Sequence, residues 1–437
     1  MLVRYTPRQL TDTDEGRVQL KPTTISFFGN FGMQNFGNEC TLQAILQNAT
    51  RFLPDASANC ICTYPWDTSA RHRIPASLIS YRYANGSAST GARDQDAPAI
   101  IRFLRRLVIR LPLEVIQWLK AFRALRGTSM LVMTGTGMLG DFGIGPFDLH
   151  YEILKWSIIA KIRRCKLLFV SVGAGPIAHP LSRWIVKRAI SLADYRSYRD
   201  DFSKDYLASI GFDTRNDFVY PDLAFSLKPG MRSSRSRDGV PRVVCLGLMD
   251  YYGKSSAHEY GEAIYQDYLD KASNILAWLL DHKYTVRLLI GDSSYDRRIK
   301  GDVVKRLQEK GSKFEKGQVI DEPVSSVEQL IAQLAEADIV IATRFHNILL
   351  ALLLNKPVVA LSYHEKIASL MAGVGMGDYC QNIDRLDVDV LVQQFLKLEK
   401  NADIVKPVIE QKVEQYRKAL DRQYAHIFNH LCAAAPR

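Results

Sequence analysis

The sequence predicts an α/β protein built of two doubly wound, Rossmann-like lobes with a cleft between them. Short apolar or β-branched runs alternate with longer helical patterns along residues 1–225, and the same alternation returns over 242–400. Such alternation is typical of parallel sheets covered by helices. Between the two sets, residues 226–241 are rich in Ser, Arg, Gly and Pro, which indicates a linker. The last segment, 401–437, is predicted to form a C-terminal helix.

The elements of the first lobe follow from its apolar runs and helix end signals. The run TTISFFG opens the sheet, and Gly211 closes the helix that starts with DDFSKDYL. Strands are predicted at 23–29, 129–134, 166–172 and 195–199, and helices at 38–52, 147–164 and 200–211.

The second lobe repeats this organisation. Its strands are predicted at 242–249, 284–291, 338–343 and 357–363, with helical segments between them. In the tail, apolar residues recur at three- and four-residue spacing, at 409, 413, 416, 420, 427 and 431, which predicts one long amphipathic helix. Because ligands of doubly wound sheets bind outside the carboxyl ends of the strands, we expect the functional site in the cleft between the lobes.

Three predicted strands of the first lobe end in glycine-rich turns, GNFGMQNFGNE, TGTGMLGD and VSVGAG. Glycine lets the backbone approach a ligand closely, and the helix after the first turn presents free N–H groups. The first turn lacks the Gly-Lys-Ser/Thr of a Walker loop, and no acid ends the strand where a dinucleotide site needs one. The glycines expected to line the cleft are Gly29, Gly32, Gly37, Gly135, Gly137 and Gly173.

Cationic side chains gather at strand ends. Arg344 and His346 follow the strand DIVIAT at the start of an apolar helix. His364 and Lys366 follow the strand PVVALSY, and Arg199 stands at a strand end of the first lobe. An Arg fork, a His and a helix N-terminus suit an oxyanion such as phosphate or carboxylate. The cluster predicts an anion site in which His346 also transfers a proton.

The composition indicates which partners and which cellular compartment to expect. The chain has 437 residues and a formal net charge of +11, which favours anionic partners. Its start has no apolar run of a secretory signal, and the run ILLALLL is too short to span a bilayer. We therefore predict a cytoplasmic protein with reduced cysteines. Cys60 and Cys62 have no second Cys or His pair at zinc-site spacing, so no metal site is predicted.

Several motifs together resemble the polysaccharide pyruvyl transferase family. They are GNFGMQNFGNECTLQAI, TGTGMLGD, VSVGAGP, SYRDDFS and, most specifically, TRFHNILLALLLNKPVVALSYHEK. The resemblance runs from about residue 25 to about residue 380 and lies in the order and spacing of the motifs. The chain departs from the family pattern at TGTG, where an uninterrupted glycine run is common, and at Asn38, where Asp is common.

The resemblance implies a two-lobed fold similar to glycosyltransferase B enzymes and phosphoenolpyruvate as the donor. By position, Arg199, Arg344 and His346 match donor-binding residues, and His364 and Lys366 join them at the same rim. The expected reaction forms a cyclic pyruvate ketal on two sugar hydroxyls. Protonated His346 would give its proton to the donor methylene, and Glu39 would accept one from the sugar. No metal or other cofactor is expected, because Arg and Lys supply the positive charge.

The stretch 100–127 has seven Arg and Lys residues against one Glu, interleaved with large apolar residues and Trp118. Pro112 is predicted to split it into two helices. One interpretation is a basic amphipathic helix on an anionic membrane, at the inner face where lipid-linked sugars are made. The other is a lobe helix whose Arg stems cover the core. No recognition motif accompanies the charge, so no nucleic-acid partner is predicted.

Two other functions are compatible with the pattern. A nucleotide-sugar-dependent glycosyltransferase of the same two-lobed shape would need an acid for the ribose hydroxyls, and Glu365 stands beside His364. A non-catalytic glycan- or membrane-binding protein is disfavoured by the intact pair Arg344 and His346. The favoured acceptor is an exopolysaccharide or cell-wall glycan, or its lipid-linked oligosaccharide precursor.

Overall fold

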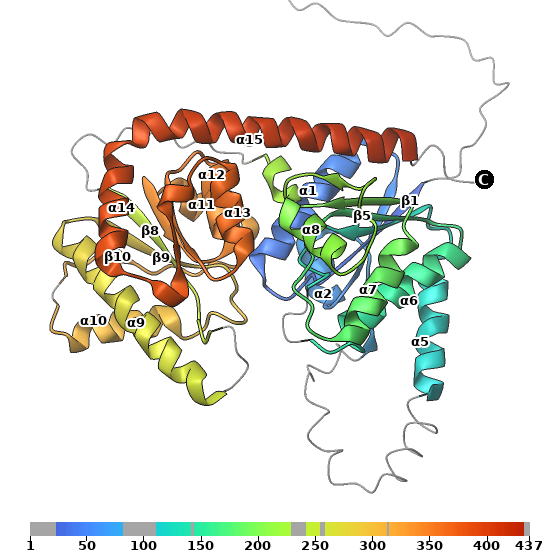
Figure 1. Ribbon diagram of the computed structural model, residues 1–437, viewed down its shortest axis with the longest axis horizontal. Coiled ribbons are helices and arrows are strands. Elements are labelled where there is room, and N and C mark those ends of the chain that lie inside the picture. The colour runs from blue at the N-terminus through green and yellow to red at the C-terminus, as the bar shows by residue number, and fades with distance from the viewer. Residues whose placement is uncertain are drawn as a thin grey trace, which may run out of the picture.

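The computed structural model describes residues 23–81, 111–140, 144–228, 242–253, 258–312 and 314–431. Within these ranges the chain forms two parallel β-sheets covered by helices, which confirms the predicted fold class. The sheets belong to two lobes that lie side by side, and α15 (Ala402–Ala425) extends across both (Figure 1). No helix in these ranges is long and apolar enough to cross a membrane.

The N-terminal lobe has a parallel sheet in the order β3-β2-β1-β4-β5-β6-β7. Its strands are β1 (Thr24–Gly29), β2 (Ser57–Cys62), β3 (Ala76–Leu78), β4 (Met130–Thr134), β5 (Lys166–Val172), β6 (Tyr195–Tyr198) and β7 (Phe218–Val219). Its helices are α1 (Phe36–Phe52), α2 (Pro65–His72), α5 (Leu111–Ala124), α6 (Leu149–Ile162), α7 (Pro180–Ser191), α8 (Asp201–Ser209) and the 3-10 helix η2 (Leu223–Ser226).

The C-terminal lobe has a parallel sheet in the order β10-β9-β8-β11-β12-β13. Its strands are β8 (Val243–Leu248), β9 (Thr285–Ile290), β10 (Val319–Ile320), β11 (Ile339–Ala342), β12 (Val358–Ser362) and β13 (Cys380–Asn382). Its helices are α9 (His258–Asp281), α10 (Ile299–Glu309), α11 (Val327–Ala335), α12 (Phe345–Leu353), α13 (Glu365–Gly373) and α14 (Val388–Lys400).

Strand β4 shows why the central strands are apolar on both sides. Leu131 and Met133 belong to a core beneath α5, α6 and α7. Met130 and Val132 face the other way, into a core that continues through α1 and η2 into the C-terminal lobe. Successive residues of a strand point to opposite faces, so a sheet covered on both faces needs continuous apolar runs. This is why such runs locate the central strands in the sequence.

The strands and helices predicted from those runs lie within two residues of the observed bounds. The interior strand β2 was missed, and so were the edge strands β3, β7, β10 and β13, each of which pairs over only two or three residues. Pro112 lies in the first turn of α5, while residues 100–110 of the basic stretch lie outside the described ranges. Of the predicted linker, Ser226 ends η2 and residues 229–241 also lie outside those ranges.

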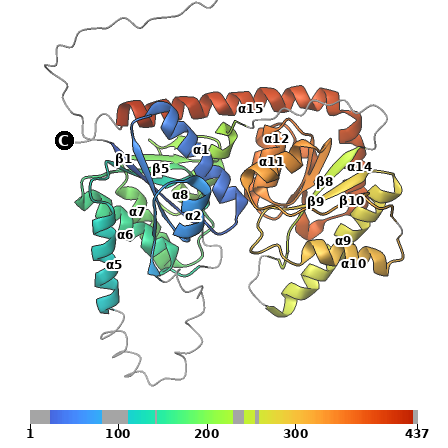
Figure 2. The ribbon, with the colours of Figure 1, turned by 180° about the vertical axis from the view of Figure 1, so that it is seen from behind.

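The lobes meet through the turn that follows β1. Asn35 Nδ2 donates to Asp292 Oδ2 at 2.7 Å, and the Phe36 N–H donates to the Gly291 carbonyl at 3.2 Å. Behind this turn, α1 packs against α11 and α12, as the view from behind shows (Figure 2). The carboxyl ends of the two sheets therefore face a common junction.

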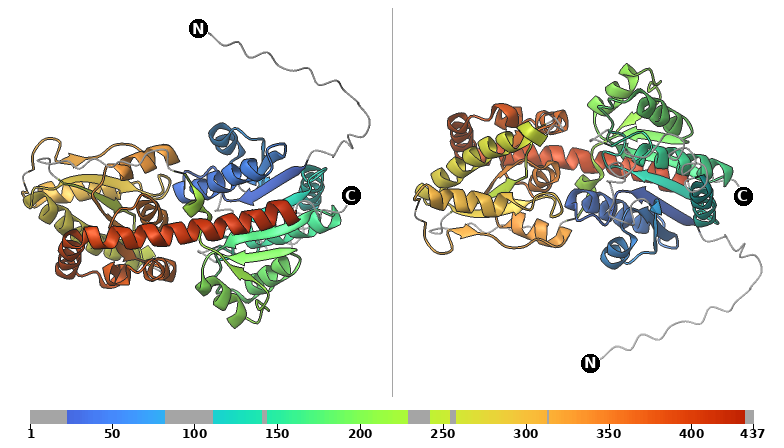
Figure 3. Two further views of the ribbon diagram at one scale, coloured as in Figure 1. Left: turned by 90° about the horizontal axis from the view of Figure 1, so that it is seen from above. Right: turned by 90° about the horizontal axis from the view of Figure 1, so that it is seen from below.

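Helix α15 ties the C-terminal end of the chain to the N-terminal lobe (Figure 3). Its Gln423 is fully buried, donates to Ser197 Oγ at 2.7 Å and accepts from Ser171 Oγ at 3.1 Å. Buried polar groups of this kind are costly when unpaired, so these hydrogen bonds fix where the helix sits. The predicted amphipathic tail thus packs across both lobes.

Candidate active site

The first turn of α12 carries the residues that the sequence marks most clearly. Arg344 is the N-cap residue, and its Nε donates to Asp296 Oδ2 at 2.8 Å while its Nη2 donates to the other carboxylate oxygen. Asp296 is buried and also accepts the N–H of Asp250 at 3.2 Å. The pair fixes the guanidinium in one orientation. It also engages Nε and Nη2 of Arg344, which was expected to bind the donor.

Three side chains meet at the lobe junction. Asp222 Oδ2 lies 3.8 Å from Arg199 Nη1 and 3.8 Å from His346 Nε2. The side chains of Arg199, Asp222 and His346 are 7%, 2% and 17% exposed. Arg199 and Asp222 follow β6 and β7 of one lobe, whereas His346 belongs to the other. The structure thus brings Arg199 and His346 together, as the sequence predicts, and adds a carboxylate between them.

An aromatic ring links this group to Lys366. Arg199 Cζ lies 5.2 Å and Lys366 Nζ 5.7 Å from the centroid of the Phe345 ring. Lys366 Nζ also lies 5.2 Å from the ring of Tyr363. Cations are attracted to the faces of aromatic rings, so the Phe345 ring helps to hold both cations beside His346. The resulting cluster suits an anion.

The electrostatics of the cluster disfavour one expected state. Burial lowers the pKa of His346 to about 3, and the nearby charges of Arg199 and Lys366 act in the same direction. Burial also lowers the pKa of Lys366, with Arg199 and Arg344 adding to the effect. Contrary to the expectation of a protonated His346, the imidazole is therefore neutral at pH 7 until negative charge enters the site.

Asp222 is the group that balances the cations. Burial raises its pKa to about 6, although Arg199 opposes this shift. Its Oδ1 accepts the N–H of Ala224 at 3.0 Å at the start of η2. Within the described residues, Asp222 Oδ2, His346 Nε2 and Arg199 Nε are buried without a hydrogen-bond partner. Arg199 Nε still lies 3.4 Å from Asp200 Oδ2, in an ion pair. Asp222 Oδ2 and His346 Nε2, 3.8 Å apart, are therefore the atoms to which a ligand would supply the missing hydrogen bonds.

Two of the predicted glycines are required by this site. A Cβ atom on Gly37 would lie 2.1 Å from His346 Nδ1, and one on Gly173 would lie 2.6 Å from Arg199 Cζ. The backbone of the first lobe therefore approaches both side chains as closely as sterics allow. A side chain at either position would displace a residue of the site.

The other glycines are explained by packing inside the N-terminal lobe. A Cβ on Gly29 would meet the Phe31 ring, one on Gly32 would meet Tyr64, and one on Gly135 would meet the Ser171 carbonyl. Gly137 is half-buried, and its carbonyl accepts the N–H of Gly140 within the same turn. These positions shape the turns rather than touch the Arg199–His346 group.

Glu39 is placed differently from the proton acceptor that was expected. It is fully buried, Oε1 accepts the Gly32 N–H at 2.8 Å, and Oε2 lies 2.7 Å from His72 Nε2. Both oxygens are engaged inside the lobe and the side chain is fully buried, so Glu39 holds the glycine turn and is not exposed to a sugar hydroxyl.

His364 stabilises the start of α13. It is the N-cap of α13, where its Nδ1 accepts the N–H of Lys366 at 3.2 Å. Its ring meets that of Phe202 edge-on, with centroids 6.0 Å apart. His364 therefore positions the turn that carries Lys366.

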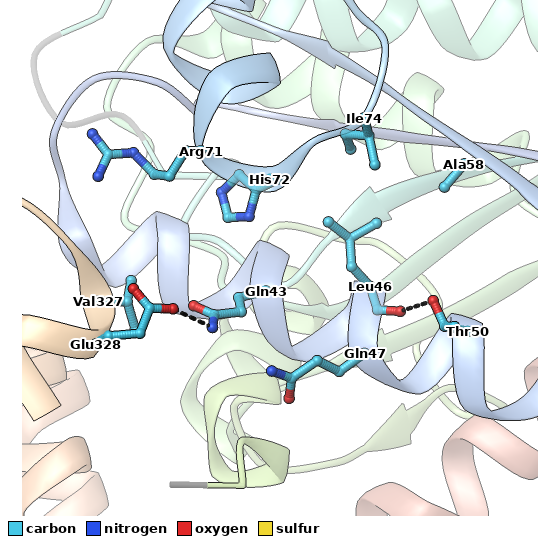
Figure 4. Close-up of a pocket in the computed structure, with 10 residues that line it drawn as sticks. All are labelled: Gln43, Leu46, Gln47, Thr50, Ala58, Arg71, His72, Ile74, Val327 and Glu328. Atoms are coloured by element: carbon cyan, nitrogen blue, oxygen red, sulfur yellow. Dashed lines mark hydrogen bonds between the residues drawn. The ribbon is translucent and has the colours of Figure 1, made fainter. Parts of the chain in front are cut away.

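A separate cavity of about 320 Å³ lies between α1, the end of α2 and the start of α11 (Figure 4). Gln43 crosses it to donate to Glu328 at 2.7 Å, and Arg71 donates to both oxygens of Asp67. The polar groups named here are paired with one another, and the predicted site residues do not line the cavity. We therefore place the site at the Arg199–Asp222–His346 junction.

Removing the Asp296 carboxylate is expected to be strongly destabilising. Asp296→Ala leaves the buried guanidinium of Arg344 without its partner, so the free energy of unfolding should fall by about 3–5 kcal/mol. Urea denaturation followed by circular dichroism measures this. The control is Asp213→Ala, whose exposed pair with Arg215 should contribute little to stability. Equal losses in the two variants would contradict the role given to Asp296.

The family model for polysaccharide pyruvyl transferases matches residues 35–365, a range that includes Arg199, Asp222, Arg344 and His346. The chain belongs to the polysaccharide pyruvyl transferase family. No curated protein matches it. The family places this transferase among enzymes, and several of the family-like motifs meet at the junction of its lobes.

Solved structures share the two-lobed architecture of this transferase. A UDP-GlcNAc 2-epimerase from Methanocaldococcus jannaschii has 11% identity and a TM-score of 0.55, with 86% of this chain and 92% of that chain covered. HepE from Anabaena, in complex with UDP and glucose, has 16% identity and a TM-score of 0.53, covering 92% and 99%. The trehalose 6-phosphate synthase of Burkholderia multivorans has 10% identity and a TM-score of 0.52, covering 96% and 99%. At such identities the likeness concerns the fold alone, which is of the glycosyltransferase B type.

Three residues of the site went unnoticed in the sequence. Asp222 follows a two-residue strand that periodicity does not reveal, although the segment YPDLAF offers a Pro-Asp turn signal. Asp296 lies in a loop more than 40 positions before its partner Arg344. Tyr363 was counted as part of a strand. Although burial favours its neutral form, Lys366 and Arg344 lower the pKa of its phenol overall.

Proposed function

We propose that this transferase moves the pyruvyl group of phosphoenolpyruvate onto two hydroxyls of a sugar, forming a cyclic ketal and releasing phosphate. The proposed acceptor is an exopolysaccharide or cell-wall glycan, or its lipid-linked precursor. The observation that carries the proposal is the meeting of Arg199, His346 and Lys366 around Phe345. A donor with both a carboxylate and a phosphate matches two cations that approach one ring from different lobes.

The proposed binding roles follow from where the cations lie. Arg199 comes from the N-terminal lobe and Lys366 from the C-terminal lobe, so a bound donor would bridge the junction. Arg344, whose Nε and Nη2 are held by Asp296, adds positive charge to the site. Cations placed in advance around the departing phosphate stabilise its negative charge as the bond breaks.

The proposed reaction begins with the transfer of one proton to a carbon atom of the donor. His346 gives a proton to the methylene carbon of the donor, which becomes a methyl group and leaves a cation at the central carbon. The first sugar hydroxyl adds to that carbon and loses its proton. The second hydroxyl then displaces phosphate, and the two hydroxyl protons go to His346 and to the departing phosphate. No further cofactor takes part in the proposal.

The low pKa of His346 links this proton to donor binding. In the free protein the imidazole is neutral, because burial and two cations oppose its charge. A bound carboxylate and phosphate bring negative charge, which favours the protonated form. We therefore propose that His346 takes up its proton together with the donor.

Donor binding is tested by stabilisation of the protein. At a concentration 100 times its dissociation constant, phosphoenolpyruvate should raise the free energy of unfolding by about 2.7 kcal/mol. Arg199→Ala should abolish this gain, whereas Arg215→Ala, on an 87% exposed side chain, should keep it. The measurement is chemical denaturation with phosphoenolpyruvate, inorganic phosphate or UDP-glucose. Stabilisation by UDP-glucose alone would overturn the proposal in favour of a nucleotide-sugar donor.

A further inference from the structure

Helix α5 is apolar on two opposite sides. Ala121 and Leu125 are buried in the core beneath the helix. On the solvent side, Val115, Ile116 and Leu119 are 53%, 45% and 50% exposed. Their spacing places them on one stripe of the helix. A surface helix normally has one apolar face and one polar face, so the outer stripe indicates a surface that is covered in use.

Exposed apolar side chains also occur on the neighbouring helices, at Ile162 of α6 and on α7. The α5, α6 and α7 helices share one core on the same face of the N-terminal sheet, and Figure 1 shows them together at one end of the molecule. Arg163, just after α6, donates to the Phe122 carbonyl at 2.8 Å and stacks on that ring, which joins α6 to α5. On α7, Trp184 is 50% exposed and Leu181 36%. We call the outer side of α5, α6 and α7 the helical layer.

The charge that faces outward from the helical layer is positive. Lys120 and Arg123 are exposed beside the apolar stripe of α5. Helix α7 contains no acidic residue, and Arg183 and Arg188 are exposed around Trp184. The acids on α5 and α6, Glu114 and Glu152, are both paired with the buried Lys155.

We propose that the helical layer docks on the surface of an anionic lipid bilayer. Exposed aliphatic and tryptophan side chains enter the headgroup region, and flanking Lys and Arg side chains bind anionic headgroups. Charge complementarity favours a bilayer over a second copy of the chain, because two such layers face to face would repel. Within the basic stretch 100–127, the membrane contact is thus assigned to α5. Helix α7, which lies outside that stretch, is added to the contact.

The topology gives the docked protein an orientation. In a parallel sheet the covering helices run opposite to the strands, so the first turns of α6 and α7 lie at the carboxyl edge. That edge also carries Arg199, at the end of β6. Docking through Leu181 and Trp184 therefore brings the membrane to the same edge of the sheet as the active site.

The test is co-sedimentation of the full chain with vesicles of phosphatidylcholine, either pure or containing phosphatidylglycerol. The chain should bind the anionic vesicles at 0.1 M salt, bind the neutral ones at least tenfold more weakly, and be released from the former at 1 M salt. Replacing Val115, Ile116 and Leu119 with Ser should weaken binding at least tenfold. Arg123→Glu with Arg188→Glu should do the same. The matched control places Ser at Ile404 and Val408, exposed apolar residues of α15, and should bind normally.

Two further measurements distinguish a bilayer from a second copy of the chain as the partner of the helical layer. Tryptophan emission should shift to shorter wavelength with anionic vesicles, and Trp184→Phe should remove most of that shift. Equal binding by the Val115/Ile116/Leu119 variant and the α15 control would overturn the proposal. So would a concentration-dependent dimer that this variant abolishes, since the layer would then be a contact between copies. Circular dichroism and thermal melting establish that each variant is folded.

Discussion

The His346→Gln variant is expected to lose about 10²- to 10⁴-fold in kcat for ketal formation, the usual contribution of a side chain that transfers a proton. The amide keeps a polar group near the volume of the imidazole but has no basic nitrogen. KM for phosphoenolpyruvate should change less than threefold, because the donor charge is met by Arg199 and Lys366. The measurement is steady-state release of phosphate in the presence of acceptor.

The ionisation of His346 adds a readout that does not depend on activity. Its folded pKa is about 3, whereas its unfolded value is near 6.5. A group whose pKa is depressed by folding contributes stability above the unfolded pKa, and this stability is lost as the pH falls from 6.5 toward 3. Between pH 7.5 and pH 5 the wild type should therefore lose about 2 kcal/mol that His346→Gln does not lose.

The matched control is His282→Gln, at an exposed histidine that stacks on Trp278. It should keep full kcat. A His346→Gln enzyme with near-normal kcat would rule out proton transfer by this residue. Parallel stability curves for His346→Gln and the wild type would show that folding leaves the pKa of His346 near its unfolded value.

Helix α12 shows most clearly which features of the site the sequence predicts and which it does not. The apolar run DIVIAT and the apolar helix after it locate Arg344 and His346 at a strand end, which is a statement about local order. That Arg344 is bound to Asp296 depends on a loop from another part of the lobe. That His346 is neutral depends on burial and on Arg199 of the other lobe. Partners and protonation states are set by tertiary packing, which residue spacing does not encode.

Glu39 is a case in which the sequence predicts a catalytic role and the structure shows a structural one. Its position in the first turn of α1, behind a glycine-rich strand end, is typical of a catalytic acid or base as well as of a structural carboxylate. The decision rests on His72, which belongs to α2, a helix that the sequence analysis did not detect. Sequence reasoning thus found the strand ends that build the site but not which polar groups satisfy one another.

The Asp222→Asn variant is expected to lower kcat about 10²-fold without raising KM for phosphoenolpyruvate. The Asp222 carboxylate lies 3.8 Å from both Arg199 Nη1 and His346 Nε2, so its charge favours protonation of His346 and helps to position Arg199. The same charge repels an anionic donor, so its removal should tighten donor binding or leave it unchanged. A residue that only binds the donor would instead raise KM when it is replaced.

Stability measurements separate this role from a general loss of structure. Burial raises the folded pKa of Asp222 to about 6, above its unfolded value near 3.8. The contribution of this carboxyl group is therefore most favourable at low pH and declines as the pH rises from about 4 to 6. Asn does not ionise, so Asp222→Asn should gain stability relative to the wild type over that interval. Asp213→Asn, at an exposed surface pair, should show neither the loss of kcat nor this gain. If Asp222→Asn raises KM at unchanged kcat, Asp222 acts in donor binding, and the proton on His346 is controlled by the donor alone.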